Sequence, residues 1–275
     1  MTILNVAISI LCIATLQPAA SFLQSTLTKV FNPHLRPASR KFTKMSASSS
    51  DRSKLIIWDC DGCLVDSEAL LKQAEVDALH KAGFTSVTRD DCNRLFSGFA
   101  PEEGAKRFKA EFGKDLPENF FRDQIANSLP LFREKLEGLN TNTVNKLFND
   151  KRPMVVASGS PRDRVLVCLE SCGMGDCFQP DEVFTREDVP GRGKPNPDMF
   201  LLAASKMGYE PAECVVVEDS AAGVKAALAA GMPVVGFLGG GHATADWYKA
   251  QLLDIMPDLP LVRTENELYE YLASK

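Results

Sequence analysis

The chain has 275 residues, of which 45% are hydrophobic, enough to bury the core of one ordinary domain and a smaller one. Its formal net charge is -5, but the first fifty residues hold five Lys and Arg and no Asp or Glu, so the remainder carries about -10. Because nucleic-acid backbones are bound through clustered Lys and Arg, this acidic body argues against a nucleic-acid partner.

Residues 1–50 have the composition of a targeting leader. Positions 3–16 are apolar but too short to span a bilayer, and the small residues at 18–21 suit a signal peptidase. Positions 22–50 are rich in Ser, Thr and basic residues, as in organelle transit segments. The tandem resembles the bipartite leaders of proteins imported into secondary plastids, so we expect a plastid location. A secreted protein, or a cytoplasmic one beginning at Met45, is the alternative. No other segment could cross a membrane, so no membrane partner is expected after leader removal.

An apolar run at 55–58 predicts a buried strand of a parallel sheet, and Gly62 releases the chain from it. Asp59 and Asp61 therefore lie at the carboxyl end of a strand, where open α/β sheets bind ligands. One carboxylate could attack phosphorus while the other moves protons, provided that a cation holds the two charges together. Taken alone, a surface Asp-x-Asp turn explains the pattern at least as well.

Eight cysteines show no disulfide framework of a small secreted domain, and several fall inside predicted strands or helices. A reducing compartment is the simpler interpretation. Cys60 and Cys63 have the spacing of a redox or zinc site, but no second pair stands at ligand spacing and the neighbouring Asp residues suit hard cations.

Between residues 66 and 150 the hydrophobic periodicity is helical, with little strand signal. Apolar residues at helical spacing predict a helix over 67–82. Further helices are predicted to begin near three later positions, Pro101, Pro117 and Thr141. We therefore expect an α-helical cap domain at 66–150, inserted into a core domain made of 51–65 and 151–275.

From residue 151 onward strands and helices alternate. Strands are predicted at 154–157, 182–184, 214–217, 233–237 and 261–262, and helices at 162–171, 198–207, 221–230, 243–253 and 265–272. Such alternation predicts an α/β fold with a doubly wound parallel sheet, covered by helices on both faces.

Two segments of this second half carry groups that suit a phosphate. Ser158 and Gly159 end the second strand, and with Ser160 capping the next helix they offer a hydroxyl, free amides and the positive end of a helix. Lys194 is held on a stiff loop by Pro195, and its ammonium could neutralise a phosphate or an attacking carboxylate. A plain strand-to-helix turn and a solvated lysine explain these residues taken separately.

Glu218 and Asp219 again place acids at the end of an apolar strand. Facing Asp59 and Asp61, they would raise one another's pKa unless a cation compensates. Mg²⁺, which takes oxygen ligands together with substrate phosphates, suits such a site. An Asp that caps the next helix is the alternative interpretation.

In chain order, the Asp-x-Asp pair, the Ser, the Lys and the Glu-Asp pair resemble the motifs of the haloacid dehalogenase-like hydrolase superfamily, and the match covers residues 55–272. The helical segment after the first motif is similar to the subfamily of phosphoglycolate phosphatases, sugar-phosphate phosphatases and β-phosphoglucomutases. The resemblance implies a Rossmann-like core with a helical cap that closes over the site.

The same resemblance implies a role for each motif residue. Asp59 would be the nucleophile that forms an aspartyl phosphate, while Asp61 protonates the leaving oxygen and then activates water. The phosphoryl oxygens would be held by Ser158, Gly159 and Lys194. Mg²⁺ would be held by the Asp59 carboxylate, the Asp61 carbonyl, Asp219 and, directly or through water, Glu218.

We therefore predict a Mg²⁺-dependent phosphatase of a small phosphorylated metabolite, either a sugar phosphate or phosphoglycolate. A β-phosphoglucomutase is one alternative, although Leu71 and Pro101 stand where the resemblance places the His and Arg of those enzymes. The other alternative is a catalytically inactive protein that binds a phosphorylated metabolite.

Overall fold

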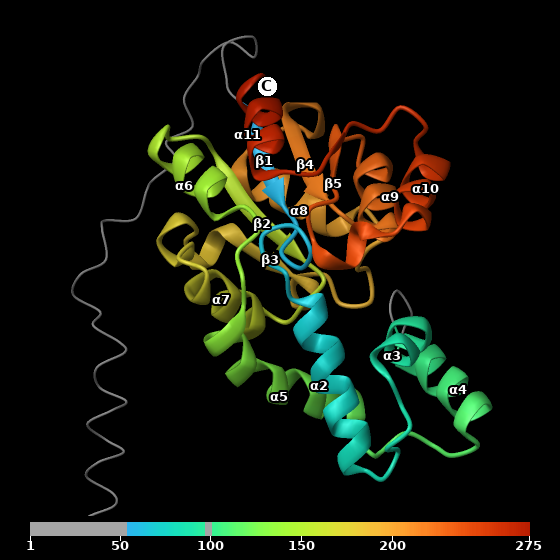
Figure 1. Ribbon diagram of the computed structural model, residues 1–275. Helices are drawn as coiled ribbons and strands as arrows, with labels where there is room; N and C mark the ends of the chain where they lie inside the picture. Colours follow the sequence, from blue (N-terminus) through green and yellow to red (C-terminus); the bar gives the residue numbers. More distant parts are fainter. Residues whose placement is uncertain (1–53, 97–100) are drawn as a thin grey trace, which may run out of the picture. The chain divides into compact units, whose positions relative to one another are not determined.

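The computed structural model describes residues 54–96 and 101–275, all within one compact unit of the chain (Figure 1). The predicted leader at 1–50, and with it the predicted plastid location, lies outside the described residues. Among the helices that are described, none combines the length and the apolar character needed to cross a bilayer.

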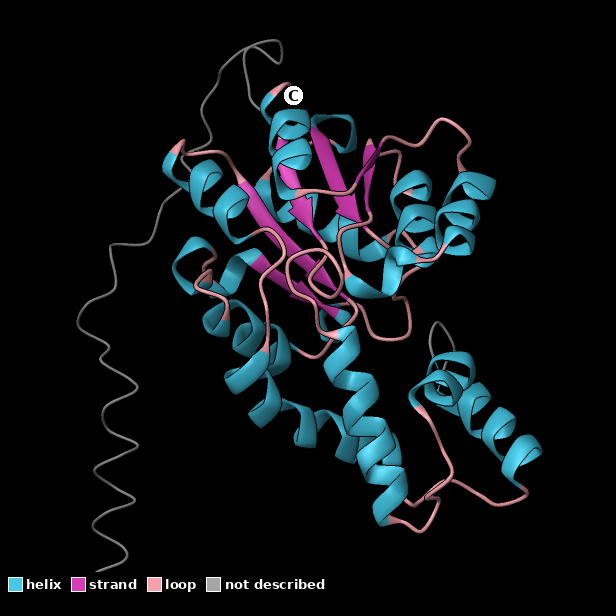
Figure 2. Cartoon of the chain, in the orientation of Figure 1, coloured by secondary structure: helices cyan, strands magenta, loops and turns pink. Residues whose placement is uncertain are grey.

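Six strands form one parallel sheet in the order β3-β2-β1-β4-β5-β6 (Figure 2). The strands are β1 (Leu55–Trp58), β2 (Met154–Ser158), β3 (Val183–Thr185), β4 (Cys214–Glu218), β5 (Val234–Phe237) and β6 (Leu261–Val262). The chain runs outward from β1 to β3 and then returns to the other side of β1 for β4. Because crossovers leave in both directions from β1, its carboxyl end opens a crevice, the usual ligand site of such sheets. The predicted doubly wound sheet is confirmed.

Successive residues of the buried strands enter two different hydrophobic clusters, one on each face of the sheet. In β1, Ile56 and Trp58 belong to the first cluster, and Leu55 and Ile57 to the second. The first face is covered by α7 (Arg162–Ser171) and α11 (Glu265–Ala273), and the second by α8 (Asp198–Met207), α9 (Ala221–Ala229) and α10 (Asp246–Ile255). Short 3-10 turns occupy the loops at Gly175–Cys177, Pro180–Glu182, Arg186–Asp188, Pro211–Glu213 and Gly241–Thr244.

The predicted helical insertion between β1 and β2 is also present. Its helices are α2 (Glu68–Lys81), α3 (Arg89–Phe96), α4 (Pro101–Phe112), α5 (Phe120–Lys135) and α6 (Thr141–Asn149). Leu79, Leu95 and Phe108 lie in a separate hydrophobic cluster of this segment. Helix α3 was not predicted, because it is short and mostly polar. The helix predicted from Pro117 to Leu131 is α5, which begins later, at Phe120, and continues to Lys135.

Helix α6 packs on the sheet side of this insertion. Val144 and Leu147 belong to the first sheet cluster. The Glu265 carboxylate at the start of α11 accepts hydrogen bonds from the Thr143 amide and the Asn142 side chain, both at 2.9 Å. The range predicted for the cap therefore includes α6, which packs with the core of the sheet, as do Leu71 of α2 and Phe132 of α5.

Candidate active site

The residues predicted to carry the chemistry line one cleft of about 940 Å³ at the carboxyl end of the sheet. They are Asp59, Asp61, Ser158, Gly159, Lys194, Glu218 and Asp219. Strands β1, β2 and β4 deliver most of them, since parallel strands end at the same edge. The Asp59 amide donates to the Val217 carbonyl at 2.9 Å, so the backbone ladder itself sets Asp59 beside the acids that follow β4.

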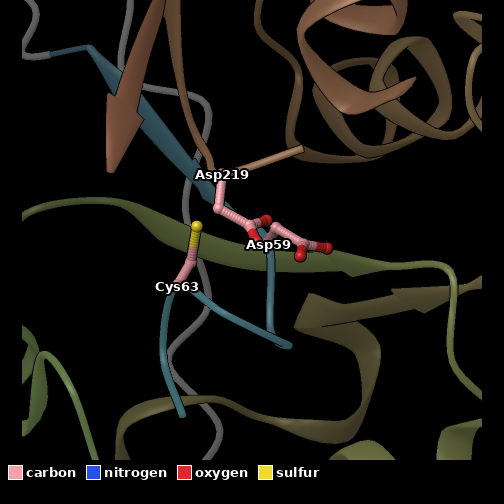
Figure 3. A group of neighbouring side chains, drawn as sticks. All are labelled: Asp59, Cys63 and Asp219. Atoms are coloured by element: carbon pink, nitrogen blue, oxygen red, sulfur yellow. The ribbon is translucent and has the colours of Figure 1, made fainter. Parts of the chain in front are cut away.

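Asp59 and Asp219 lie together with the Cys63 thiol, and their ligand atoms are within 4.8 Å of one another (Figure 3). All three side chains are buried. One oxygen of Asp219, Oδ2, is engaged by His242 Nε2 at 2.6 Å and by the Tyr248 hydroxyl at 3.3 Å. This leaves Asp219 Oδ1 for a ligand.

Gly62 makes this close arrangement possible. Its φ of +79° lies in the left-handed region that favours glycine. A Cβ at this position would stand 2.2 Å from Asp219 Oδ2 and 2.7 Å from His242 Cε1. A glycine is therefore required at this position both by the turn that ends β1 and by the close contact of Asp219 with the backbone.

Lys194 is held between two carboxylates. Its Nζ lies 2.6 Å from Asp59 Oδ1 and 2.6 Å from Glu218 Oε1. Glu218 is fully buried, and its Oε2 accepts hydrogen bonds from the Ser220 amide and hydroxyl at 2.8 and 3.0 Å. A Cβ on Gly223 would stand 1.6 Å from Glu218 Oε1, so the glycine of α9 leaves room for this carboxylate. The Glu218 side chain therefore faces Lys194 and the first turn of α9.

Asp61 has a separate set of partners. Its carboxylate accepts from Arg164 at 2.5 Å, and from the Ser160 and Ser67 hydroxyls at 2.5 Å each. Burial alone would raise the pKa of Asp61, but the Arg164 guanidinium and the two hydroxyls outweigh it and lower that pKa below its ordinary value. Asp61 is thereby charged and has its own countercharge.

The other acids of the cluster are not neutralised by the positive charge beside them. Asp59, Glu218 and Asp219 set three carboxylates against the one ammonium of Lys194, a net charge of -2. Burial raises the pKa of Asp59 well above its ordinary value, and that of Asp219 to about 6. His242 compensates part of this negative charge. Burial alone would lower the imidazole pKa, but the contact with Asp219 outweighs burial and raises that pKa. Buried oxygen ligands with this excess of negative charge fit a divalent cation.

Ser158 and Gly159 form the turn between β2 and α7. The Ser158 hydroxyl is buried and accepts from the Ser160 amide at 3.1 Å, and a Cβ on Gly159 would meet nothing within 4 Å. The backbone at Gly159 therefore borders open space in the cleft. The expectation that Ser160 caps α7 is wrong, because its hydroxyl donates to Asp61. Helix α7 begins at Arg162, with Pro161 at the N-cap position and no side-chain cap.

The residues that sequence reasoning missed include Ser67, Arg164, His242 and Tyr248, which contact the acids of the cleft. Arg164 lies in the first turn of α7, the helix that starts at the predicted phosphate turn, and this position was a usable signal. His242 follows β5, another strand that ends at the same edge, but its glycine-rich surroundings indicated only a flexible turn. Tyr248 lies on α10 and has no sequence signal.

Comparisons with known proteins agree with this geometry. A family model described as haloacid dehalogenase-like hydrolase matches residues 53–231. The chain is 29% identical over 195 residues to 6-phosphogluconate phosphatase of Escherichia coli, covering 70% of this chain and 85% of that protein. It is 31% identical over 182 residues to fructose-1-phosphate phosphatase YqaB of the same bacterium, covering 66% and 94%. A crystal structure of a HAD family hydrolase from Deinococcus radiodurans, with bound phosphate and sodium, superimposes with a TM-score of 0.66 at 25% identity, covering 81% of this chain and 96% of that one.

Proposed function

The chain belongs to the haloacid dehalogenase-like hydrolases, and from this membership we propose that it is a Mg²⁺-dependent phosphatase that hydrolyses a small phosphorylated metabolite through an aspartyl phosphate. The predicted family and the predicted enzyme class, a phosphomonoesterase, are confirmed by the family match and by relatives named as phosphatases. The intermediate, the cation and the substrate remain parts of the proposal.

The observation that carries the proposal is the buried cluster of Asp59, Asp219 and Lys194. Lys194 engages Asp59 Oδ1 and leaves Oδ2 free to attack phosphorus. The attack forms a bond from Oδ2 to phosphorus and breaks the bond to the leaving oxygen. Mg²⁺, when bound by Asp59, Asp219 and the Asp61 carbonyl, would supply charge neutralisation for the phosphoryl oxygens. Lys194 and the Ser158–Gly159 turn would hold the remaining phosphoryl oxygens.

Asp61 would give its proton to the leaving oxygen and then take a proton from the water that hydrolyses the acyl phosphate. In the protein without substrate, Arg164 and two hydroxyls lower the pKa of Asp61. A phosphate dianion in the cleft would raise it again, because a like charge disfavours the ionised carboxylate. This shift would supply the protonated acid that the first step needs.

We assign Glu218 to the orientation of Lys194 rather than to the cation that the sequence suggested. Its two oxygens are occupied by Lys194 and Ser220, and the group of metal-ligand atoms found among the described residues contains Asp59, Cys63 and Asp219 instead. A fully buried carboxylate that fixes an ammonium makes the phosphate site rigid.

The remainder of the cleft supports a polyhydroxylated leaving group, hence a sugar phosphate. Polar side chains line it from α2, α3 and α10, with donors on Lys72 and Arg94, an acceptor on Glu68, and both on Asn93 and Gln251. Leu71 is buried in a sheet cluster and offers no imidazole to a sugar bisphosphate, which does not favour a mutase.

We propose that helices α2 to α5 form the cap. We also propose that residues 1–50 direct the protein to a plastid, which a fluorescent fusion of those residues would test.

The decisive assay is hydrolysis of para-nitrophenyl phosphate with Mg²⁺, with EDTA, and after Mg²⁺ is restored. We expect turnover that EDTA removes and Mg²⁺ recovers, and no turnover in Asp59→Asn. Asp258→Asn, which alters an exposed acid away from the cleft, is the matched control. Phosphate binding without metal-dependent turnover would instead support the inactive binding protein. A panel of sugar phosphates then identifies the substrate.

A further inference from the structure

The thiol of Cys63 is the feature of the site that phosphatase chemistry with Mg²⁺ does not use. Its side chain is fully buried, and its sulfur lies within 4.8 Å of a carboxylate oxygen of Asp59 and of Asp219, the neighbouring side chains in Figure 3. Among the described residues no hydrogen bond to this thiol is found, although Cys172 and Cys177 each donate one to an oxygen. Mg²⁺ takes oxygen ligands, so it would leave the sulfur without a role.

We propose that the same centre binds a thiophilic divalent cation, of the class of Zn²⁺ and Cd²⁺, with the Cys63 thiolate as a third ligand beside Asp59 and Asp219. Zn²⁺ bonds sulfur at about 2.3 Å and carboxylate oxygen at about 2.0–2.2 Å, which sets the ligand atoms of a tetrahedral site about 3.5 Å apart. The three atoms already lie within 4.8 Å of one another. Side-chain rotations that close this gap by about 1 Å complete three of the four ligands.

Binding exchanges one proton for one bond. The sulfur–hydrogen bond breaks, the sulfur–metal bond forms, and the proton leaves to the buffer. Mg²⁺ takes oxygen ligands, so it forms no bond to the sulfur that would displace the thiol proton. The centre therefore distinguishes soft from hard cations by whether the thiol is ionised.

This exchange changes the charge that the phosphate meets. Two carboxylates and Mg²⁺ sum to zero, whereas two carboxylates, a thiolate and Zn²⁺ leave a net charge of -1. The metal–sulfur bond makes a thiophilic cation bind more tightly than Mg²⁺. Because the phosphate dianion is then repelled, this cation inhibits turnover. The inhibition rests on the proposed phosphatase function, while the binding of the cation does not.

Titration of the metal-free full chain with Cd²⁺, followed by the ultraviolet sulfur-to-cadmium charge-transfer absorption, tests the proposal. We expect a saturable tight phase in the wild type that excess Mg²⁺ suppresses. In Cys63→Ser and Cys63→Val the affinity of this phase falls by more than about tenfold, because the metal–sulfur bond is lost. Cys172→Ser, which alters a cysteine outside the cleft, keeps the tight phase.

A tight phase that Cys63→Ser and Cys63→Val both retain would overturn the proposal, as would a tight phase that Mg²⁺ does not suppress. Circular dichroism shows whether each variant is folded. If Cys63→Ser does not fold, the cadmium affinity of Cys63→Val tests the proposal. The two hypotheses fail separately. A Cys63-dependent cadmium phase without phosphatase turnover would refute the proposed function and support the cation site. Mg²⁺-dependent turnover without a Cys63-dependent cadmium phase would support the function and refute the site.

Discussion

Replacing Gly62 with Ala would separate backbone strain from a steric clash at the centre of the site. The left-handed φ of +79° costs a residue with a Cβ about 1–2 kcal/mol. The new Cβ would also stand 2.2 Å from Asp219 Oδ2 and 2.7 Å from His242. Relieving this clash in a packed site costs about 1–3 kcal/mol more. We expect Gly62→Ala to lower the free energy of unfolding by about 2–5 kcal/mol and to weaken Mg²⁺ activation, because Asp219 is displaced.

Gly231→Ala is the matched control. Gly231 has a φ of +70°, and a Cβ there would meet nothing within 4 Å, so only the backbone cost of about 1–2 kcal/mol applies. Urea unfolding of the metal-free variants, followed by tryptophan fluorescence, gives the two free energies, and the Mg²⁺ concentration for half-maximal turnover gives the effect on the site. Equal losses of stability in the two variants, with an unchanged Mg²⁺ requirement, would refute the steric argument.

Three further outcomes are expected. Lys194→Met leaves Asp59 and the fully buried Glu218 without their cation, so it should abolish turnover and cost about 3–5 kcal/mol in urea unfolding at neutral pH; a variant as stable as the wild type would contradict the pairing. Arg164→Met removes the group that lowers the pKa of Asp61, so the alkaline limb of the pH–rate profile should move to higher pH, and an unmoved limb would refute the coupling. The pKa of Asp219 rises from 3.8 to about 6 on folding, so the metal-free protein loses stability as the pH rises through that window, because the unfolded state gives up its proton first. Mg²⁺ should therefore raise the melting temperature more at about pH 7.5 than at about pH 5, and this difference should vanish in Asp219→Asn.

The convergence of the site followed from one rule, that parallel strands end at a common edge. Asp59, Ser158 and Asp219 each come after an apolar run, and the rule brings such positions together whatever lies between them in the sequence. Strands β1, β2 and β4 could be predicted from the sequence because they are buried on both faces and are therefore almost continuously apolar.

The partners of these acids could not be predicted in the same way. Arg164 and Tyr248 reach the site from helices, where the direction of a side chain depends on packing rather than on a strand end. Glu218 and Asp219 are adjacent in sequence, yet one faces Lys194 and the other faces Asp59 and Cys63, a divergence that only the backbone path after β4 determines. His242 depends on the 3-10 turn at Gly241–Thr244, which also delays the start of α10 to Asp246.

The hydrogen bond from the Asp59 amide to Val217 fixes the two halves of the acidic cluster through the sheet alone. Helices α2 to α5 lie in the sequence between β1 and β2, so they are not part of this connection. With the roles proposed above, a different leaving group requires new side chains on helices α2, α3 and α10 and none in the strands. Diversification of specificity on this scaffold therefore leaves the strands unchanged, and exchanging the cleft-lining positions of these helices between related chains would transfer substrate preference while each recipient keeps its own reaction chemistry.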